Sequence, residues 1–194
     1  MNWLDAVAAV LCFFYLPIPV YWLLLHPLTR FCRGRERAAL WIAFAIAWSP
    51  GGAYITVLRD HLFAASTAPL WALAAGTALV MLDAAVLFRV HRELGAARLV
   101  GQAELTGSGE LNTTGLYASV RHPRYAAMIA GMAGVCLIAG TLLLWATAAV
   151  WWLLVLIAIW LEERELLARF GEAYARYRAR VPAFLPLRIR PRDR

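Results

Sequence analysis

Long apolar stretches alternate with arginine-rich polar segments along this chain of 194 residues. A helix needs roughly 20 apolar residues to cross a hydrocarbon core about 30 Å thick. Three stretches have about that length, and a fourth, 124–160, is long enough for two helices with Gly140 and Thr141 as a tight turn between them. The pattern therefore predicts five transmembrane helices, the last two forming a hairpin, at about 3–25, 38–58, 69–88, 124–139 and 142–161.

The same pattern predicts an all-α, polytopic membrane protein with a single domain, 1–194. Pro17 and Pro19 lie inside the first apolar run and predict a kink, because proline removes a helical hydrogen bond. The chain shows no internal repeat, Gly-Ser linker or low-complexity tract that would divide it. Its two longest polar segments are a connector, 89–123, and a tail, 162–194.

Composition supports a membrane protein, because 62% of the residues are hydrophobic and the mean hydropathy is +0.63. The N-terminus has no basic region and carries Asp5, so we expect no cleaved signal peptide there. Three cysteines, Cys12, Cys32 and Cys136, are unclustered and lack metal-ligand spacing. We interpret them as small apolar fillers of the core.

Charge sets the expected orientation. All nineteen basic residues are arginines, and in the five-span topology only Arg59 lies on the face opposite the others. The positive-inside rule then predicts an external N-terminus, with the connector 89–123 and the tail 162–194 in the cytosol. The net charge of +7 is confined to the connections, where anionic lipid head groups are the expected partners rather than nucleic acid. Because both segments flank the hairpin, we expect them to enclose a cytosolic pocket.

Candidate chemistry begins at 115–125, "GLYASVRHPRY". Pro123 suits the first turn of a helix, so the stretch predicts a helix entrance that carries a titratable His122. A purely structural interpretation stays open: Arg121 and Arg124 would reach toward lipid head groups while His122 and Tyr125 anchor the interface.

A second cluster follows the last predicted span, where Glu162 and Glu163 are costly unless they meet water or a cation. Apolar and aromatic residues recur after them at helical spacing, which predicts an amphipathic helix over 162–179 on the bilayer surface. In the structural alternative the two acids only pair with Arg169 or other arginines. Since His122 is the sole companion for a metal at these carboxylates, we expect no metal site.

Asp83 is the one acid deep inside a predicted span. An intramembrane carboxylate is a functional candidate by default. It is alternatively protonated, or hydrogen-bonded to Thr77 or to a residue on another helix, and we leave it out of the candidate site.

Together the two stretches resemble the integral membrane methyltransferases of the isoprenylcysteine carboxyl methyltransferase and phospholipid methyltransferase family. The shared pattern is "RHPRY", then the helical hairpin, then "EERELLARFGEAYARYRARVPAFLP", with "HRELG" at 91–95 upstream. The resemblance covers residues 88–186, about half of the chain. Either box alone has little specificity, whereas the two boxes at this spacing are specific.

The resemblance implies S-adenosylmethionine as the methyl donor and a lipophilic, membrane-associated acceptor, with membrane lipids as partners. It carries cofactor contacts onto residues of the connector, the helix entrance and the first acid of the pair. These are Gln102, Gly109, Glu110, Leu111, Asn112, Tyr117, His122, Pro123, Arg124, Tyr125 and Glu162. Of these, His122 and Glu162 are the candidate catalytic residues.

The chemistry of these residue types fits that expectation. A carboxylate such as Glu162 suits the ammonium of S-adenosylmethionine, and the faces of Tyr117 and Tyr125 suit its adenine or cationic sulfur. Methyl transfer from a sulfonium is an in-line displacement, so positioning and exclusion of water supply much of the catalysis. A general base is needed only for a protonated amine or a thiol, and His122 is the nearest candidate by type.

The chain departs from the carboxyl-methylating relatives at two positions. They place an arginine four residues before the first acid, where this chain has Ala158, and Arg98 stands in place of a tryptophan. A substrate carboxylate would lack its cation, so we expect a neutral or amine-bearing acceptor. The alternatives are carboxyl methylation, with Arg121 or Arg124 compensating, and a non-catalytic partner-binding protein that keeps the fold. A transporter or channel subunit is disfavoured by the scarcity of intramembrane charge.

Overall fold

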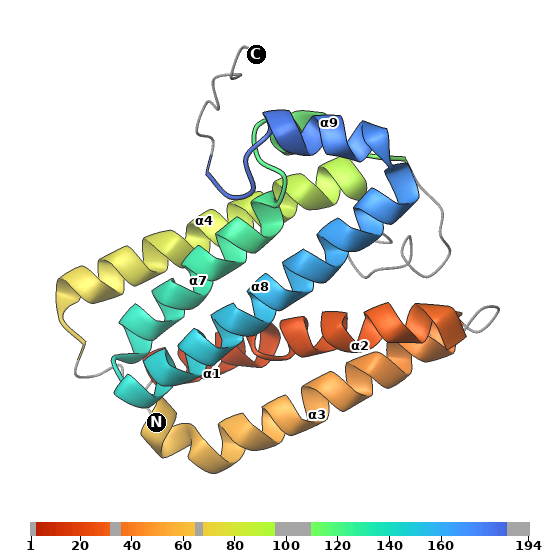
Figure 1. Ribbon diagram of the computed structural model, residues 1–194. Coiled ribbons are helices and arrows are strands. Elements are labelled where there is room, and N and C mark those ends of the chain that lie inside the picture. Colours follow the sequence, from red (N-terminus) through yellow and green to blue (C-terminus); the bar gives the residue numbers. More distant parts are fainter. Residues whose placement is uncertain (1–2, 32–35, 65–67, 96–109, 186–194) are drawn as a thin grey trace.

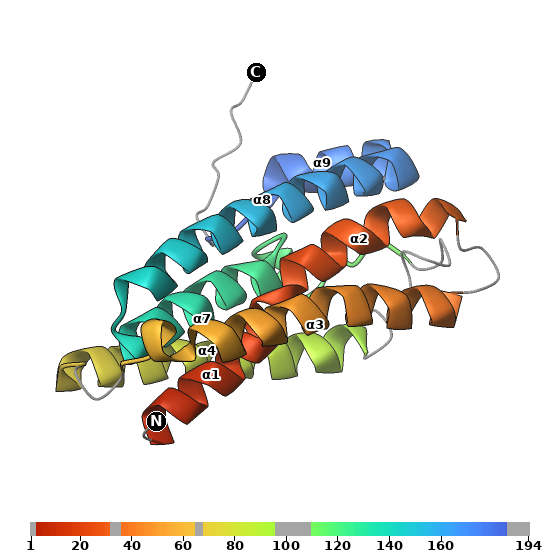
Figure 2. The ribbon, with the colours of Figure 1, turned by 90° about the horizontal axis from the view of Figure 1, so that it is seen from below.

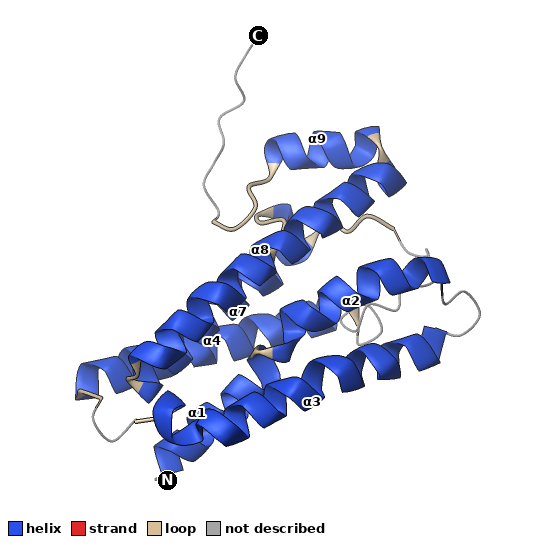
Figure 3. Ribbon diagram, turned by 60° about the horizontal axis from the view of Figure 1, so that its bottom comes forward, coloured by secondary structure: helices blue, strands red, loops and turns tan. Residues whose placement is uncertain are grey.

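The computed structural model describes residues 3–31, 36–64, 68–95 and 110–185, which form helices and loops without a strand in those ranges (Figures 1 and 3). Secondary structure is therefore all-helical, as the sequence predicts. The elements are α1 (Trp3–Tyr15), α2 (Pro17–Phe31), α3 (Glu36–Leu62), α4 (Leu70–Leu94), the short 3₁₀ helix η2 (Gly115–Ala118), α7 (Pro123–Ala139), α8 (Leu142–Phe170) and α9 (Glu172–Arg180).

Within the described residues, four helical stretches are long and apolar enough to cross a membrane: Trp3–Leu25, Arg37–Leu62, Leu70–Leu94 and Leu142–Phe170. Pro123–Ala139 is a fifth apolar helix of shorter length. Large apolar side chains cover the outside of these helices, including Trp41, Val57, Leu70, Met81 and Leu153. Such an exterior suits lipid rather than water, so the chain is a helical polytopic membrane protein.

The predicted kink is present in the first apolar run. Helix α1 ends at Tyr15 and α2 begins at Pro17, with Leu16 as a turn between them. Pro17 and Pro19 are both fully buried. The break is a consequence of proline chemistry, since Pro17 takes the first position of a new helix, where no N–H donor is needed.

Helices α4 and α7 share the most extensive contact among the described helices, and two glycines face each other across it. A Cβ built on Gly76 would lie 2.6 Å from the carbonyl oxygen of Gly134, and a Cβ on Gly134 would lie 2.6 Å from that of Gly76. Small residues at such crossings let the helix backbones approach within membranes. The close approach of Gly76 and Gly134 fixes the position of α7 on α4, and therefore also the position of the residues at the start of α7.

The α7–α8 hairpin turns where the sequence predicts. Gly140 adopts the left-handed conformation, with φ of +71°, and ends α7. The Thr141 hydroxyl accepts from the backbone N–H of Leu144 and donates to the Leu62 carbonyl at 2.6 Å. The turn is thereby capped and tied to the end of α3.

The predicted amphipathic helix over 162–179 is wrong in its boundaries. Helix α8 continues without a break through Glu162 and Glu163 to Phe170, and a separate helix, α9, begins at Glu172. Gly171 separates them with φ of +51°, a conformation that glycine adopts without steric cost. Both acids therefore lie on the last turns of a long helix rather than at the start of a surface helix.

One end of the bundle gathers the segments that the sequence marks as arginine-rich. The end of α2, the start of α3, the end of α4, the start of α7 and α9 lie at that end, while the end of α3, the start of α4 and the α7–α8 turn lie at the other (Figures 1 and 2). Helix α9 crosses over this end of the bundle (Figure 1). The candidate residues of the sequence analysis are thus brought to one place.

Candidate functional site

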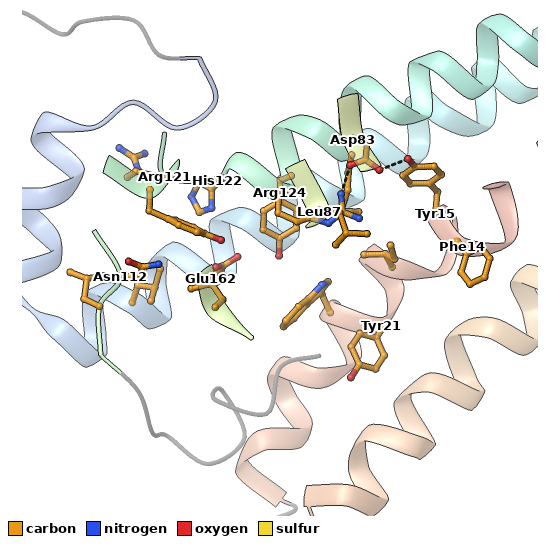
Figure 4. Close-up of a pocket in the computed structure, with 18 of the residues that line it drawn as sticks. Phe14, Tyr15, Tyr21, Asp83, Leu87, Asn112, Arg121, His122, Arg124 and Glu162 are labelled. Carbon is orange, nitrogen blue, oxygen red and sulfur yellow. Dashed lines mark hydrogen bonds and ion pairs between the residues drawn. The ribbon is translucent and has the colours of Figure 1, made fainter. Parts of the chain in front are cut away.

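A cavity of about 680 Å³ lies among the helices on this side of the molecule, within the roughly 300–1,000 Å³ usual for ligand sites. Its polar end, under α9 and η2, includes Asn112, Tyr117, Arg121, His122, Glu162 and Tyr174. Its apolar arm, between α1, α2 and α3, includes Phe14, Ile18, Tyr21, Trp22, Phe44 and Trp48. Figure 4 shows Asn112, His122 and Glu162 on one side of the cavity and Phe14 and Tyr21 on the other.

Glu93, at the end of α4, positions the residues around Gly115 at the polar end of the cavity. The backbone N–H of Leu116 donates to Glu93 Oε2 at 3.1 Å. Gly115 has φ of +59°, and a Cβ there would come within 2.5 Å of the Glu93 carboxylate. Only glycine allows this approach. Glu93 and Gly115 therefore place η2, which carries Tyr117.

The Glu163 carboxylate joins the start of α7 to α9. Arg121 Nη2 donates to Glu163 Oε1 at 2.7 Å, and Arg121 Nε donates to the same oxygen at 3.1 Å. Arg178 Nε lies 3.4 Å from Glu163 Oε2. The Arg121 and Glu163 side chains are only 11% and 12% exposed, so their pair is weakly screened by solvent.

Backbone contacts strengthen the same junction. Arg121 N donates to the Pro182 carbonyl at 2.9 Å, and His122 N donates to that of Ala183 at 3.0 Å. The Tyr177 hydroxyl donates to the Tyr117 carbonyl at 2.7 Å. Burial raises the pKa of Tyr177 to about 12, so its hydroxyl remains a donor at neutral pH. Residues 117–122, the Glu163 carboxylate and the segment 177–183 thus form one wall, which we call the clamp.

His122 is buried in this wall, with 4% of its surface exposed, and lines the cavity. Its Nε2 lies 3.1 Å from Glu163 Oε1. Because an ionised carboxylate only accepts hydrogen bonds, Nε2 carries the proton in this pair. In the neutral imidazole the lone pair then belongs to Nδ1, which is the atom able to take up a proton.

Glu162 and Tyr174 present unsatisfied polar groups to the cavity. Within the described part of the chain, the Glu162 carboxylate makes no hydrogen bond or ion pair. Tyr174 is 1% exposed, and its buried hydroxyl has no partner among the described residues. Burial, and secondarily the charge of Glu162, raises the pKa of Tyr117. Buried polar groups are normally satisfied, so the unpaired Tyr174 hydroxyl, in one cavity with the half-buried Glu162 carboxylate, suits a bound polar ligand.

Asp83 lies where the polar end meets the apolar arm. Arg124 Nη1 donates to Asp83 Oδ1, and the Tyr15 hydroxyl donates to Asp83 Oδ2. The partners of this carboxylate are therefore on α7 and α1, as the alternative of a partner on another helix predicts. All three side chains line the cavity, and Figure 4 shows Arg124 between His122 and Tyr15.

Most of the residues proposed from the sequence come together in this cavity. The lining includes Glu110, Leu111, Asn112, Tyr117, His122, Arg124, Tyr125 and Glu162. Pro123 is buried as the first residue of α7 and is not part of the lining, so its role is to start the helix. Gln102 and Gly109 lie outside the described residues.

Sequence reasoning missed the importance of Glu93, Glu163 and Tyr174. Glu163 was treated as a companion of Glu162, although it is the residue that holds Arg121 and His122. A signal was available for Tyr174, because it belongs to the repeated aromatic spacing after the acid pair. Ala158 is fully buried and does not line the cavity, so that position supplies no polar group to it.

The architecture and the cavity define a helical membrane protein with a cavity that is polar at one end and continues into an apolar arm. A model of the phospholipid methyltransferase family matches residues 71–173, just over half of the chain. The chain therefore belongs to the phospholipid methyltransferase family of membrane methyltransferases. No curated protein and no solved structure matches it. Among the described residues, no group of three or more His, Cys, Asp or Glu side chains forms a metal site.

Proposed function

We propose that the protein is an S-adenosylmethionine-dependent methyltransferase that acts on a lipophilic, membrane-associated acceptor. The observation that carries the proposal is one continuous cavity whose polar end holds the unpaired Glu162 carboxylate and the unpaired Tyr174 hydroxyl, and whose other part is an apolar arm. A polar cofactor and a lipid-like acceptor could meet in such a cavity without leaving the membrane surface.

The polar end fits S-adenosylmethionine by its donor set. Glu162 offers a negative charge to an ammonium or a sulfonium, while Tyr174 and Asn112 offer hydrogen bonds to neutral groups. The aromatic faces of Tyr117 and Tyr125 suit an adenine ring or the cationic sulfur. These residues, with Glu110, Leu111, His122 and Arg124, would hold the cofactor. Gln102 and Gly109 remain proposed contacts on the family resemblance alone.

When bound, the cofactor would supply an electrophilic methyl group on a positively charged sulfur. The clamp would hold the polar end closed and exclude water, since Glu163 ties α7 to α9. Exclusion of water and fixed orientation are the main contributions that in-line displacement asks of a protein.

For an acceptor that carries a proton on its nucleophilic atom, His122 Nδ1 would accept that proton. Its Nε2–H is held by Glu163, which fixes the ring tautomer and stabilises the imidazolium that forms. This contact leaves Nδ1 as the ring nitrogen that would act as a general base. Glu162 would contribute by binding, without taking part in proton transfer.

The experiment is a thermal titration of detergent-solubilised protein with S-adenosylhomocysteine. The wild type should show a saturable rise in melting temperature, because a ligand that binds only the folded state stabilises it. Glu162→Gln and His122→Ala should each weaken binding by roughly 1–3 kcal/mol, the usual cost of a lost charged hydrogen-bond partner.

Glu165→Gln is the matched control, since Glu165 lies on the same helix, is exposed and does not line the cavity. It should bind like the wild type. A wild-type protein whose melting temperature is insensitive to S-adenosylhomocysteine would overturn the proposed function and leave the non-catalytic alternative. Binding that is normal in Glu162→Gln and His122→Ala would show that other residues hold the cofactor.

A further inference from the structure

The junction between the polar end and the apolar arm is built around one buried carboxylate. Asp83, on α4, is 4% exposed and receives hydrogen bonds from Arg124 at the start of α7 and from Tyr15 at the end of α1. All three side chains line the cavity. An acceptor whose chain lies in the arm would place its head group beside them (Figure 4).

The surrounding helices make room for this group and orient it. A Cβ on Gly131 would come within 2.4 Å of the Tyr15 hydroxyl and 3.0 Å of Asp83 Cβ, so the glycine leaves the space that both occupy. Trp151 Nε1 donates to the Tyr15 backbone carbonyl at 2.8 Å, and the two rings meet edge to face. The packing of α1, α4 and α7 therefore holds the Asp83 carboxylate in a defined position.

The charges of the neighbouring arginines are matched by acceptors within the protein. Arg121 uses Nε, Nη1 and Nη2 on Glu163 and on the carbonyls of Arg178 and Val181. The guanidinium of Arg124 pairs with Asp83, and its side chain is 19% exposed. Arg124 is thus the cation that Asp83 neutralises at the junction, while Arg169 also lines the cavity.

We propose that Asp83 sets the charge selectivity of the acceptor: by neutralising Arg124 it admits neutral or cationic head groups and excludes anionic ones. The inference rests on the proposed function and adds the residue that selects among acceptors. In a low-dielectric cavity an anionic head group needs a cation to replace its hydration. At this junction it would meet Arg124 already paired with Asp83 and would have to displace that carboxylate.

The proposal predicts that loss of the Asp83 charge converts the junction into an anion site. Asp83→Asn keeps the size of the side chain and an acceptor for Tyr15, but leaves Arg124 without its counter-charge. The test uses three photoreactive amphiphiles with one diazirine-bearing alkyl chain and a carboxylate, an alcohol or an amine head group. Cross-linked positions in the detergent-solubilised protein are then quantified by mass spectrometry.

In the wild type, the alcohol and the amine should label the arm at Phe14, Ile18 or Trp22, and the carboxylate should label it at least ten times less. Labelling at Val57, which is 77% exposed on the outer surface, gives the reference for non-specific contact. In Asp83→Asn the carboxylate should label the arm at least tenfold more than in the wild type, with the alcohol unchanged. Adding Arg124→Gln to that variant should abolish the gain.

Tyr15→Phe is the matched control, because it removes one hydrogen bond to Asp83 and keeps the ion pair. Its labelling should follow the wild-type order. Equal labelling of the wild-type arm by the carboxylate and the alcohol would overturn the proposal, and this comparison does not require any variant to fold. A folded Asp83→Asn protein without the gain would overturn it too. Melting shifts with S-adenosylhomocysteine, measured on the same preparations, report separately on the proposed function.

Discussion

Glu162 and Glu163 are adjacent on α8, yet their carboxylates have separate surroundings. Glu163 accepts hydrogen bonds from Arg121 and pairs with His122 and Arg178, whereas Glu162 faces the cavity and pairs with no described residue. Successive residues of an α-helix point about 100° apart, so one turn of α8 can serve both the clamp and the ligand site. Glu163 is therefore expected to stabilise the clamp, and Glu162 to remain available to a ligand.

Removing the Glu163 charge should destabilise the polar end of the molecule. In Glu163→Gln the largely buried Arg121 guanidinium, whose side chain is 11% exposed, loses its counter-charge, and breaking such a weakly screened pair costs about 3 kcal/mol. Thermal unfolding in detergent measures the effect. Arg178→Gln is the control, since the Arg178 side chain is 51% exposed and its pair with Glu163 should contribute less than about 1 kcal/mol. Equal stability of the two variants would contradict a structural role for Glu163.

Tyr174→Phe should separate ligand binding from folding. The hydroxyl is buried without a partner among the described residues, so its removal should leave the stability of the folded protein unchanged or slightly increased. Binding of S-adenosylhomocysteine should weaken by about 1 kcal/mol if the ligand satisfies that hydroxyl. Melting curves with and without ligand give both quantities. A variant that binds as tightly as the wild type would remove Tyr174 from the ligand site.

The close approach of α4 and α7 should make Gly134 intolerant of a side chain. In Gly134→Ala the new Cβ would meet the Gly76 carbonyl oxygen at 2.6 Å, and a backbone atom cannot rotate away. We expect a loss of about 1–3 kcal/mol in stability, the range for overpacked contacts. Gly52→Ala is the control, because its Cβ would lie 3.4 Å from the Phe13 ring. Similar melting temperatures for the two variants would contradict the tight crossing.

The predicted orientation is tested by cysteine labelling in sealed membranes, after replacement of Cys32. Cysteines at positions 35, 107 and 190 should react from the cytosolic side and a cysteine at position 66 from the other side. All four positions lie outside the described residues, and the expected orientation rests on the distribution of arginines along the chain. Reaction of positions 66 and 107 from the same side would mean that α4 does not cross the membrane.

The acceptor is tested by radiolabelled methyl transfer to a farnesylcysteine analogue and to a panel of membrane lipids. We expect little methylation of the farnesylcysteine carboxylate, because Ala158 supplies no cation and Arg121 and Arg124 are already paired within the protein. Neutral or amine-bearing lipids should be the better acceptors. Robust turnover of the farnesylcysteine analogue, unchanged in Ala158→Arg, would contradict this expectation.

The sequence predicted the helices well because apolar length and proline or glycine breaks are local properties of the chain. The kink at Pro17 and the turn at Gly140 depend on backbone chemistry that neighbouring residues determine. Helix ends were less accurate: α8 continues to Phe170, since Gly171 rather than the first charge ends it. Polar residues tolerated by a long helix do not mark its boundary.

The sequence identified many of the residues that line the candidate site, but it did not show which partner each of them contacts. His122, Tyr117 and Glu162 were identified by residue type and spacing, and all three line the cavity. The partners of Asp83 were not identifiable, because Tyr15 and Arg124 are 68 and 41 residues away and meet it only after three helices pack. Likewise, the choice between Glu162 and Glu163 depends on the rotation of α8 about its axis, which side-chain spacing within one helix does not determine.

The clamp has a consequence for protein engineering. Residues 121–122 share hydrogen bonds and an ion pair with Glu163 and with the 178–183 segment, so the two stretches are complementary surfaces from distant parts of the chain. A substitution that changes Arg121 or His122 alone would leave unmatched donors and acceptors along that seam. Exchanging 115–125 together with 163–183 would transplant a self-consistent unit, and pairs of substitutions across the seam should rescue each other where single ones fail.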